Sequence, residues 1–130
     1  MKRDYFRDTA TLAFWRFGAL RNKSVEEYLA ENNINREEYR GFCEDLFAVS
    51  DTLLELASTN REYIVEAVRE IYMCSRKYPD HKDIAGRVRR YALIVPASEK
   101  TVYKWLETAR DIYTLKRGLA TNTPPGFGEI

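Results

Sequence analysis

The segment "VPASEKTVYKWLETARDIY", residues 95–113, decides how the C-terminal half of this chain folds. Ser98 stands two residues after Pro96 and is a typical helix N-cap, since its hydroxyl can accept a backbone N–H of the first turn. Val102, Leu106 and Ala109 follow at spacings of four and three, which places them on one side of a helix. The segment therefore predicts a helix over residues 99–117 with an apolar inner side, ended by a glycine at position 118.

Helical patterns extend over the rest of the chain. Apolar residues recur at spacings of three, four and seven, and no stretch shows the alternation of a strand. An opening helix is predicted over residues 3–21 and another over residues 81–94. The starts of three further helices are indicated by capping pairs: Ser24 with Glu27, Asn35 with Glu38, and Asn60 or Thr59 with Glu62. We predict an all-α fold of about six helices, a small bundle with a C-terminal helix-turn-helix.

Length and composition limit the class of protein. With 130 residues, the chain suits one compact domain or two small helical parts that share a core. No apolar run approaches the roughly 20 residues that span a bilayer, and no convincing signal peptide is present. Cys43 and Cys74 lie on predicted helices without metal-ligand spacing, so we expect reduced, buried thiols in a cytoplasmic protein. No metal or cofactor and no membrane partner is expected.

Charge is divided unevenly along the chain. Residues 1–60 carry eight Lys or Arg and eleven Asp or Glu, a net charge of −3, whereas residues 61–118 carry thirteen and eight, a net charge of +5. This asymmetry predicts that a polyanion contacts residues 61–118 only. We assign residues 1–60 to a helical scaffold or association part, residues 61–118 to a DNA-binding part, and residues 119–130 to a flexible tail.

Two helices joined by a short break at a proline must cross steeply, which is the geometry of a helix-turn-helix. Once the apolar stripe of the second helix is buried, the side chains left outside are candidates for contact with base edges: Lys100, Thr101, Tyr103, Lys104 and Glu107. Polar and basic side chains around them are candidates for contact with phosphates: Arg87, Arg89, Arg90, Ser98, Lys116 and Arg117.

The stretch "SEKTVYKWLETAR" resembles the recognition helix in the fourth region of bacterial sigma factors and related regulators. The resemblance covers about thirty residues and rests on a serine cap, Thr-Val three and four residues later, and then Leu and Ala-Arg. It implies Ser98 as cap, Val102 and Leu106 as core, and DNA contacts from four residues: Lys100, Thr101, Tyr103 and Lys104. More residues separate "DIA" from the cap than in the compact motif, so the first helix is longer or the turn wider. The arrangement is also similar to small regulators of phages and mobile elements.

Three other features have alternative interpretations. Phe14, Trp15 and Phe17 indicate either a central buried helix or a homodimer or partner interface. The acidic segment "SVEEYLAENNINREEY" suits a scaffold or protein contact. His81 stands alone beside two aspartates with no nucleophile implied nearby, so we expect no enzyme activity.

The sequence therefore predicts a non-catalytic protein that binds double-stranded DNA in a sequence-specific manner and acts as a small transcriptional regulator. The alternatives are a helical protein–protein interaction module, a DNA-binding packaging or recombination accessory, and an ordinary solvated face at the basic residues.

Overall fold

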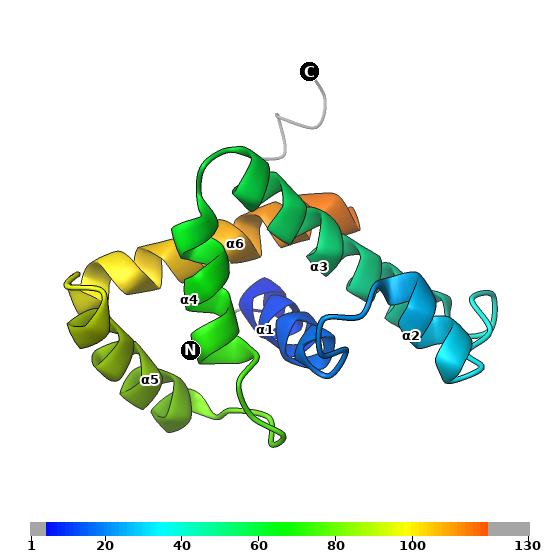
Figure 1. Ribbon diagram of the computed structural model, residues 1–130, viewed down its shortest axis with the longest axis horizontal. Coiled ribbons are helices and arrows are strands. Elements are labelled where there is room, and N and C mark those ends of the chain that lie inside the picture. Colours follow the sequence, from blue (N-terminus) through cyan, green and yellow to red (C-terminus); the bar gives the residue numbers. More distant parts are fainter. Residues whose placement is uncertain (1–4, 120–130) are drawn as a thin grey trace.

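The computed structural model describes residues 5–119 and contains six helices in that range (Figure 1). They are α1 (Tyr5–Gly18), α2 (Val25–Glu31), α3 (Arg40–Ser58), α4 (Glu62–Tyr72), α5 (His81–Ile94) and α6 (Glu99–Arg117). No strand occurs among these residues, which confirms the all-α prediction. The bounds of α5 and α6 are those expected from the sequence.

Side-chain caps begin three of the helices. The Ser24 hydroxyl accepts the backbone N–H of Glu27, whose carboxylate accepts the Ser24 N–H in return, as predicted for α2. Asp80 and Asp83 form the same reciprocal pair at the start of α5. Ser98 caps α6, and Gly118 ends it in the left-handed conformation, with φ of 76°, where a side chain would be strained.

Two predicted helix starts were placed too early. Asn35 Oδ1 does accept the N–H groups of Glu37 and Glu38, but it caps a turn, and α3 begins only at Arg40. The N-cap of α4 is Arg61, which makes no side-chain cap. The Thr59 hydroxyl serves the end of α3 instead: it donates to the Glu55 carbonyl at 2.8 Å, and its oxygen accepts the Arg61 Nε–H at 2.9 Å.

The main core is built around the inner side of α6. Val102, Leu106, Ala109 and Tyr113 are fully buried, and α6 packs on α1, α3, α4 and α5. Phe14 of α1 completes this core, with its ring 5.7 Å from that of Tyr113. Because the core combines residues 10 to 113, the parts before and after residue 60 share one interior.

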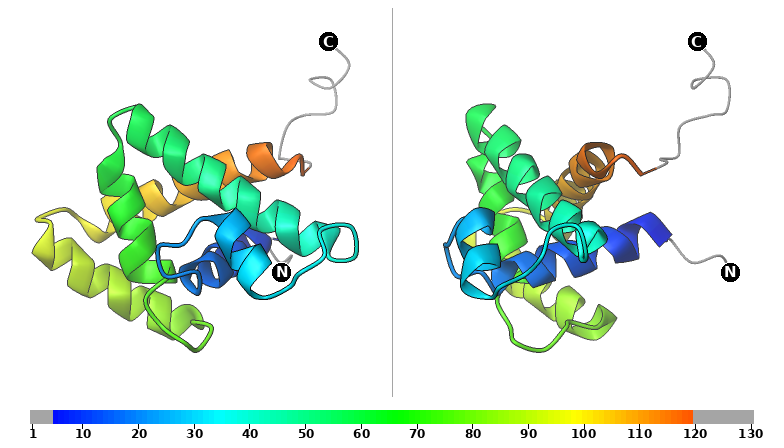
Figure 2. Two further views of the ribbon diagram at one scale, coloured as in Figure 1. Left: turned by 45° about the vertical axis from the view of Figure 1, so that its right-hand side comes forward. Right: turned by 90° about the vertical axis from the view of Figure 1, so that its right-hand side faces the viewer.

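A smaller core holds α2 in place. Val25 and Leu29 of α2 are buried with Cys43 and Leu46 of α3 and with Leu20 from the segment after α1. Among the described helices, α2 packs only on α3. It lies at the opposite end of the molecule from α5, and the turned views keep the two apart (Figures 1 and 2).

Two expectations outside the helices need correction. Cys43 is buried, but Cys74 is exposed, since α4 ends at Tyr72 and leaves Cys74 in the following loop. Leu119, assigned to the tail, packs against the main core, and its N–H bonds to the Thr114 carbonyl. The remainder of the predicted tail, residues 120–130, lies outside the described residues.

The division of α6 into an inner and an outer side can be tested by two substitutions. Leu106→Ala should lower the free energy of unfolding by about 2–5 kcal/mol, as truncation of a fully buried leucine does. Lys104→Ala, on the exposed side, should change it by less than about 0.5 kcal/mol. Chemical denaturation measures both, and equal losses would mean that the wrong side was assigned to the core.

Candidate nucleic-acid interface

Helices α5 and α6 are joined by only four residues, 95–98, and meet at a sharp corner at one end of the molecule (Figure 1). The connection is held by two backbone bonds, from the Val95 N–H to the Tyr91 carbonyl and from the Ala97 N–H to the Ala92 carbonyl. Helix α4 packs against both α5 and α6. The corner is therefore supported from inside, while its outer sides remain in solvent.

The predicted base-facing side chains all stand on the outside of α6. Lys100, Thr101, Lys104 and Glu107 are exposed, and Tyr103 is 42% exposed. Lys100 and Lys104 are one helical turn apart on one stripe, which Glu107 continues. Tyr103 points to another side, where it lines a hollow of about 590 Å³ together with residues of α1 and α5. Contact of these residues with DNA stays a prediction.

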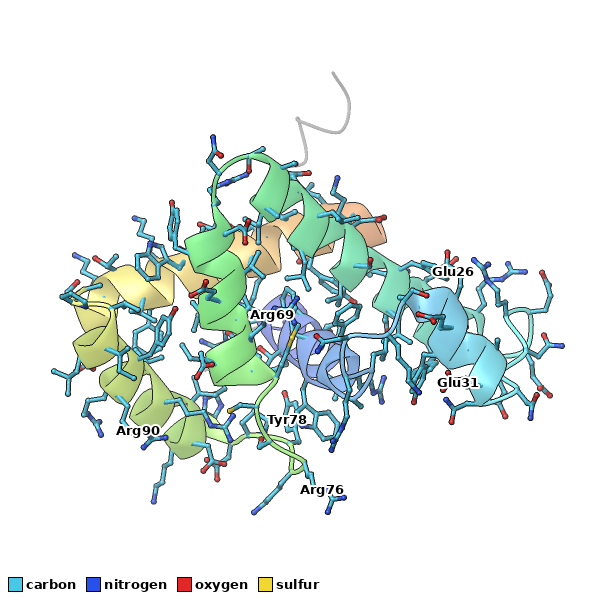
Figure 3. The ribbon with its side chains drawn as sticks, viewed as in Figure 1. Glu26, Glu31, Arg69, Arg76, Tyr78 and Arg90 are labelled. Carbon is cyan, nitrogen blue, oxygen red and sulfur yellow. The ribbon has the colours of Figure 1, made fainter. Side chains whose placement is uncertain are left out.

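Two of the predicted phosphate contacts on α5 are available for a ligand. The side chains of Arg89 and Arg90 are exposed and make no hydrogen bond or ion pair with the described part of the chain. Figure 3 shows Arg90 extending from α5 into solvent. Lys82, which is not among the predicted phosphate contacts, is also exposed. It could have been found, because it precedes Arg89 by seven residues and so lies on the same side of a helix.

Arg87 has an internal role that the sequence did not reveal. Its guanidinium donates to the Ile71 carbonyl at 2.7 Å and to the Ser75 hydroxyl at 3.0 Å. Arg87 thus provides a hydrogen-bond donor for a carbonyl in the last turn of α4 and links α5 to α4. A phosphate could engage Arg87 only at the expense of these bonds, so the structure does not support the predicted contact.

Lys116 and Arg117 are likewise engaged inside the molecule. Lys116 pairs with Glu55 at 2.8 Å, and Arg117 bonds to Asp45 at 2.6 Å and pairs with Glu44 at 3.2 Å. All three carboxylates belong to α3, which packs along α6. These pairs neutralise the C-terminal end of α6, contrary to the predicted phosphate contacts there. Ser98 is also committed, because its hydroxyl accepts the Thr101 N–H and donates to the Thr101 hydroxyl.

Acidic residues on α4 set one limit of the basic surface. Burial, together with the charges of Glu66 and Glu70, raises the pKa of the Tyr91 hydroxyl on the side of α5 that faces α4. Both glutamates are exposed. A polyanion is therefore favoured on the outer side of α5 and disfavoured on the side next to α4.

The aromatic residues of α1 do not form an open surface. Phe14 has no exposed area. The Trp15 indole N–H donates to the Ser75 carbonyl at 3.0 Å, and its ring meets the edge of Tyr78. Phe17 packs against both cores. Of the two interpretations of this cluster, the structure supports the buried helix and not the interface, since these side chains bind the loop after α4 to the core.

Comparison of the chain with protein families, with curated proteins and with solved structures gave no match. Within residues 5–119, no group of three or more His, Cys, Asp or Glu is placed to hold a metal ion. Likewise, none of the six helices has the length and apolar character needed to cross a membrane.

The bonds between α6 and α3 predict a loss of stability at alkaline pH. The Tyr113 hydroxyl donates to Asp45, and burial, followed by the charge of Asp45, raises the pKa of this tyrosine. An unfolded tyrosine titrates near pH 10, so the folded state keeps a proton that the unfolded state has lost above that pH. The contribution of the protonated Tyr113 hydroxyl to the free energy of unfolding is complete below about pH 10 and is lost as the pH rises further.

Urea denaturation from about pH 8 to about pH 11 measures this effect as a fall in the free energy of unfolding. In the Tyr113→Phe variant the free energy of unfolding should fall less steeply with pH than in the unchanged chain. Tyr39→Phe, at an exposed position, should show the same pH dependence as the unchanged chain. The assignment fails if the Tyr113→Phe variant retains the full dependence.

Proposed function

We propose that this protein binds double-stranded DNA through the outer sides of α5 and α6. The observation that supports this most directly is a group of exposed cations with no partner in the described chain: Lys82, Arg89, Arg90, Lys100 and Lys104. They lie on two consecutive helices that meet at a corner, as in a helix-turn-helix. A cation that pairs internally is already partly neutralised, so these unpaired cations contribute more to the release of counterions from DNA.

In this proposal the two helices have different tasks. The first turns of α6 enter the major groove, where Lys100 and Lys104 reach base edges beside Thr101. Tyr103 faces the hollow next to α1 and has no part in this contact. Lys82, Arg89 and Arg90 meet the phosphates and hold α6 in register. Glu107 marks the end of the contact, since its carboxylate repels the backbone.

The biological role that fits this surface best is that of a small, non-catalytic transcriptional regulator in the cytoplasm, of the phage or mobile-element type. The resemblance of residues 98–110 to the sigma-factor recognition helix supports this choice. A packaging or recombination accessory would use the same surface and the same contacts.

A second candidate function is protein–protein interaction at the corner itself. Leu93 and Ile94, on the last turn of α5, are 80% and 73% exposed, more than any other large apolar side chain of the described chain. Exposed aliphatic side chains of this kind are typical of partner contacts when they lie together. The sequence suggested this interaction at the aromatic N-terminal helix or at the acidic segment of residues 24–39, whereas the exposure of Leu93 and Ile94 favours the last turn of α5.

The phosphate contacts predict steep salt dependence. Affinity for mixed duplex fragments should fall as salt rises, and the double variant Arg89→Glu with Arg90→Glu should weaken binding to all sequences alike. Mobility-shift titrations at several salt concentrations measure both effects. As a matched control, Arg40→Glu reverses an exposed cation at the start of α3 and should leave affinity unchanged. Affinity indifferent to salt and to the double variant would refute the proposal.

The base contacts predict a different response. Lys100→Ala and Lys104→Ala should alter which sequences are preferred, because a lost base contact costs about 1–3 kcal/mol of discrimination. Selection of binding sites from a random duplex library, repeated for each variant, measures the preference. An unchanged preference in both variants would assign these lysines to phosphate contact.

A further inference from the structure

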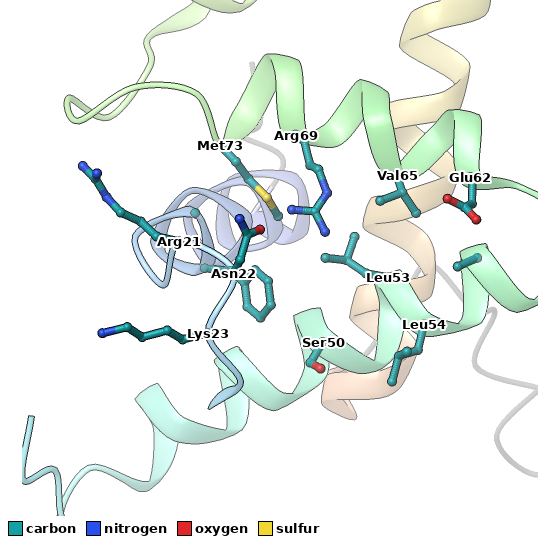
Figure 4. Close-up of a pocket in the computed structure, with 13 residues that line it drawn as sticks. Arg21, Asn22, Lys23, Ser50, Leu53, Leu54, Glu62, Val65, Arg69 and Met73 are labelled. Carbon is teal, nitrogen blue, oxygen red and sulfur yellow. The ribbon is translucent and has the colours of Figure 1, made fainter. Parts of the chain in front are cut away.

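A groove of about 440 Å³ runs between α3 and α4, on elements other than the outer sides of α5 and α6 (Figure 4). It extends along α4 from Glu62 to the C-cap residue Met73, which corresponds to about 16 Å at the rise of an α-helix. The last residue of α1 and the segment after it close one end, where Gly18 lies against Met73: a Cβ at position 18 would lie 2.9 Å from the Met73 Cβ. The groove thus has a fixed end wall.

The floor of the groove is apolar, and its rim exposes a further apolar side chain. It is lined by Phe17 of α1, Leu53 of α3, Val65 of α4 and Met73 directly after α4. Leu54, on α3, also lines it and is 65% exposed. An apolar strip of this length between two helices can accept the apolar side of a third helix, which is a recurrent mode of peptide recognition.

The charges of the groove favour an acidic occupant. Figure 4 shows the Arg69 side chain reaching from α4 over the floor toward Asn22 and Leu53. Arg69 makes no hydrogen bond or ion pair through its side chain with the described residues. Arg21 lies at the same end with its side chain turned outward, and Lys23 is paired with Glu31. The sole carboxylate among the lining residues is Glu62, at the opposite end.

We infer that this groove binds an acidic amphipathic helix of a protein partner. Its apolar side chains rest on the floor beside Leu54, and a carboxylate pairs with Arg69. A nucleic-acid backbone would satisfy Arg69 but would leave the apolar floor without a partner, whereas an acidic amphipathic helix satisfies both. The inference does not rest on DNA binding, because the two surfaces have no cation in common.

The test uses the full chain and two labelled peptides of about eighteen residues, long enough to form a helix. One peptide carries leucines at every third and fourth position with glutamates between them, and the matched peptide has lysines in place of the glutamates. Fluorescence anisotropy measures their affinities. The acidic peptide should bind about tenfold more tightly than the lysine peptide, as charge complementarity requires.

Three variants separate the groove from the α5–α6 surface. Arg69→Glu and Leu54→Asp should each weaken the acidic peptide by about tenfold, because they remove a charge partner and an apolar contact. Both positions are exposed, so the variants should retain the thermal unfolding profile of the unchanged chain, measured by circular dichroism. Arg89→Glu should weaken DNA binding and leave peptide binding unchanged.

Several results would overturn the inference: equal affinity for both peptides, undiminished binding by the Arg69→Glu variant, or no binding at all. Displacement of the acidic peptide by a DNA oligonucleotide in the Arg89→Glu background would instead make the groove a nucleic-acid site. Loss of DNA binding in that variant together with intact peptide binding would keep the two surfaces separate.

Discussion

Burial of the inner side of α6 is the constraint on which the rest of the structure depends. Val102, Leu106 and Tyr113 have no exposed area, and α1, α3, α4 and α5 all pack against this helix. Burial of each large apolar side chain contributes about 1.5–3 kcal/mol. A half-turn rotation of α6 would expose all three and bury Lys100 and Lys104 without partners, which is far more costly. The orientation of α6, and with it the outer surface of the corner, follows from this packing.

Contacts between α3 and α6 determine where positive charge remains available. Glu55 and Asp45 neutralise the C-terminal end of α6, and within residues 5–119 no carboxylate pairs with the lysines of its N-terminal half. The net charge of residues 61–118 is therefore concentrated toward α5 and the start of α6. The acidic α2 lies at the far end of the molecule, so it does not oppose a polyanion there (Figure 3). Packing converts a modest charge asymmetry along the chain into a localised basic surface.

Helix α4 supports both proposed surfaces. Ile64, Val68 and Ile71 face the main core, and Arg69 lines the groove on another side of the same helix. Val65 belongs to both the core and the groove. Arg87 joins the end of α4 to α5, and Trp15 joins the following loop to α1. The corner and the groove are thus both built on α4, and the two proposed surfaces have no side chain in common.

Sequence by itself determined the helical class, the bounds of α5 and α6, the Ser24 and Ser98 caps and the buried stripe of α6. These are local properties, because caps and apolar spacing act within a turn or two of the chain. Neither Thr59 nor Asn35 opened a helix as expected, since each hydrogen-bonds elsewhere in its own turn.

Only the tertiary structure decided which cations are available to a ligand, that Phe14 is buried, and that a groove exists beside Arg69. Arg117 and Asp45 are 72 residues apart in sequence, and Arg87 and Ile71 are 16 apart. Such pairs form because packing brings distant segments together, and helical periodicity carries no information about which distant side chain will meet a given arginine.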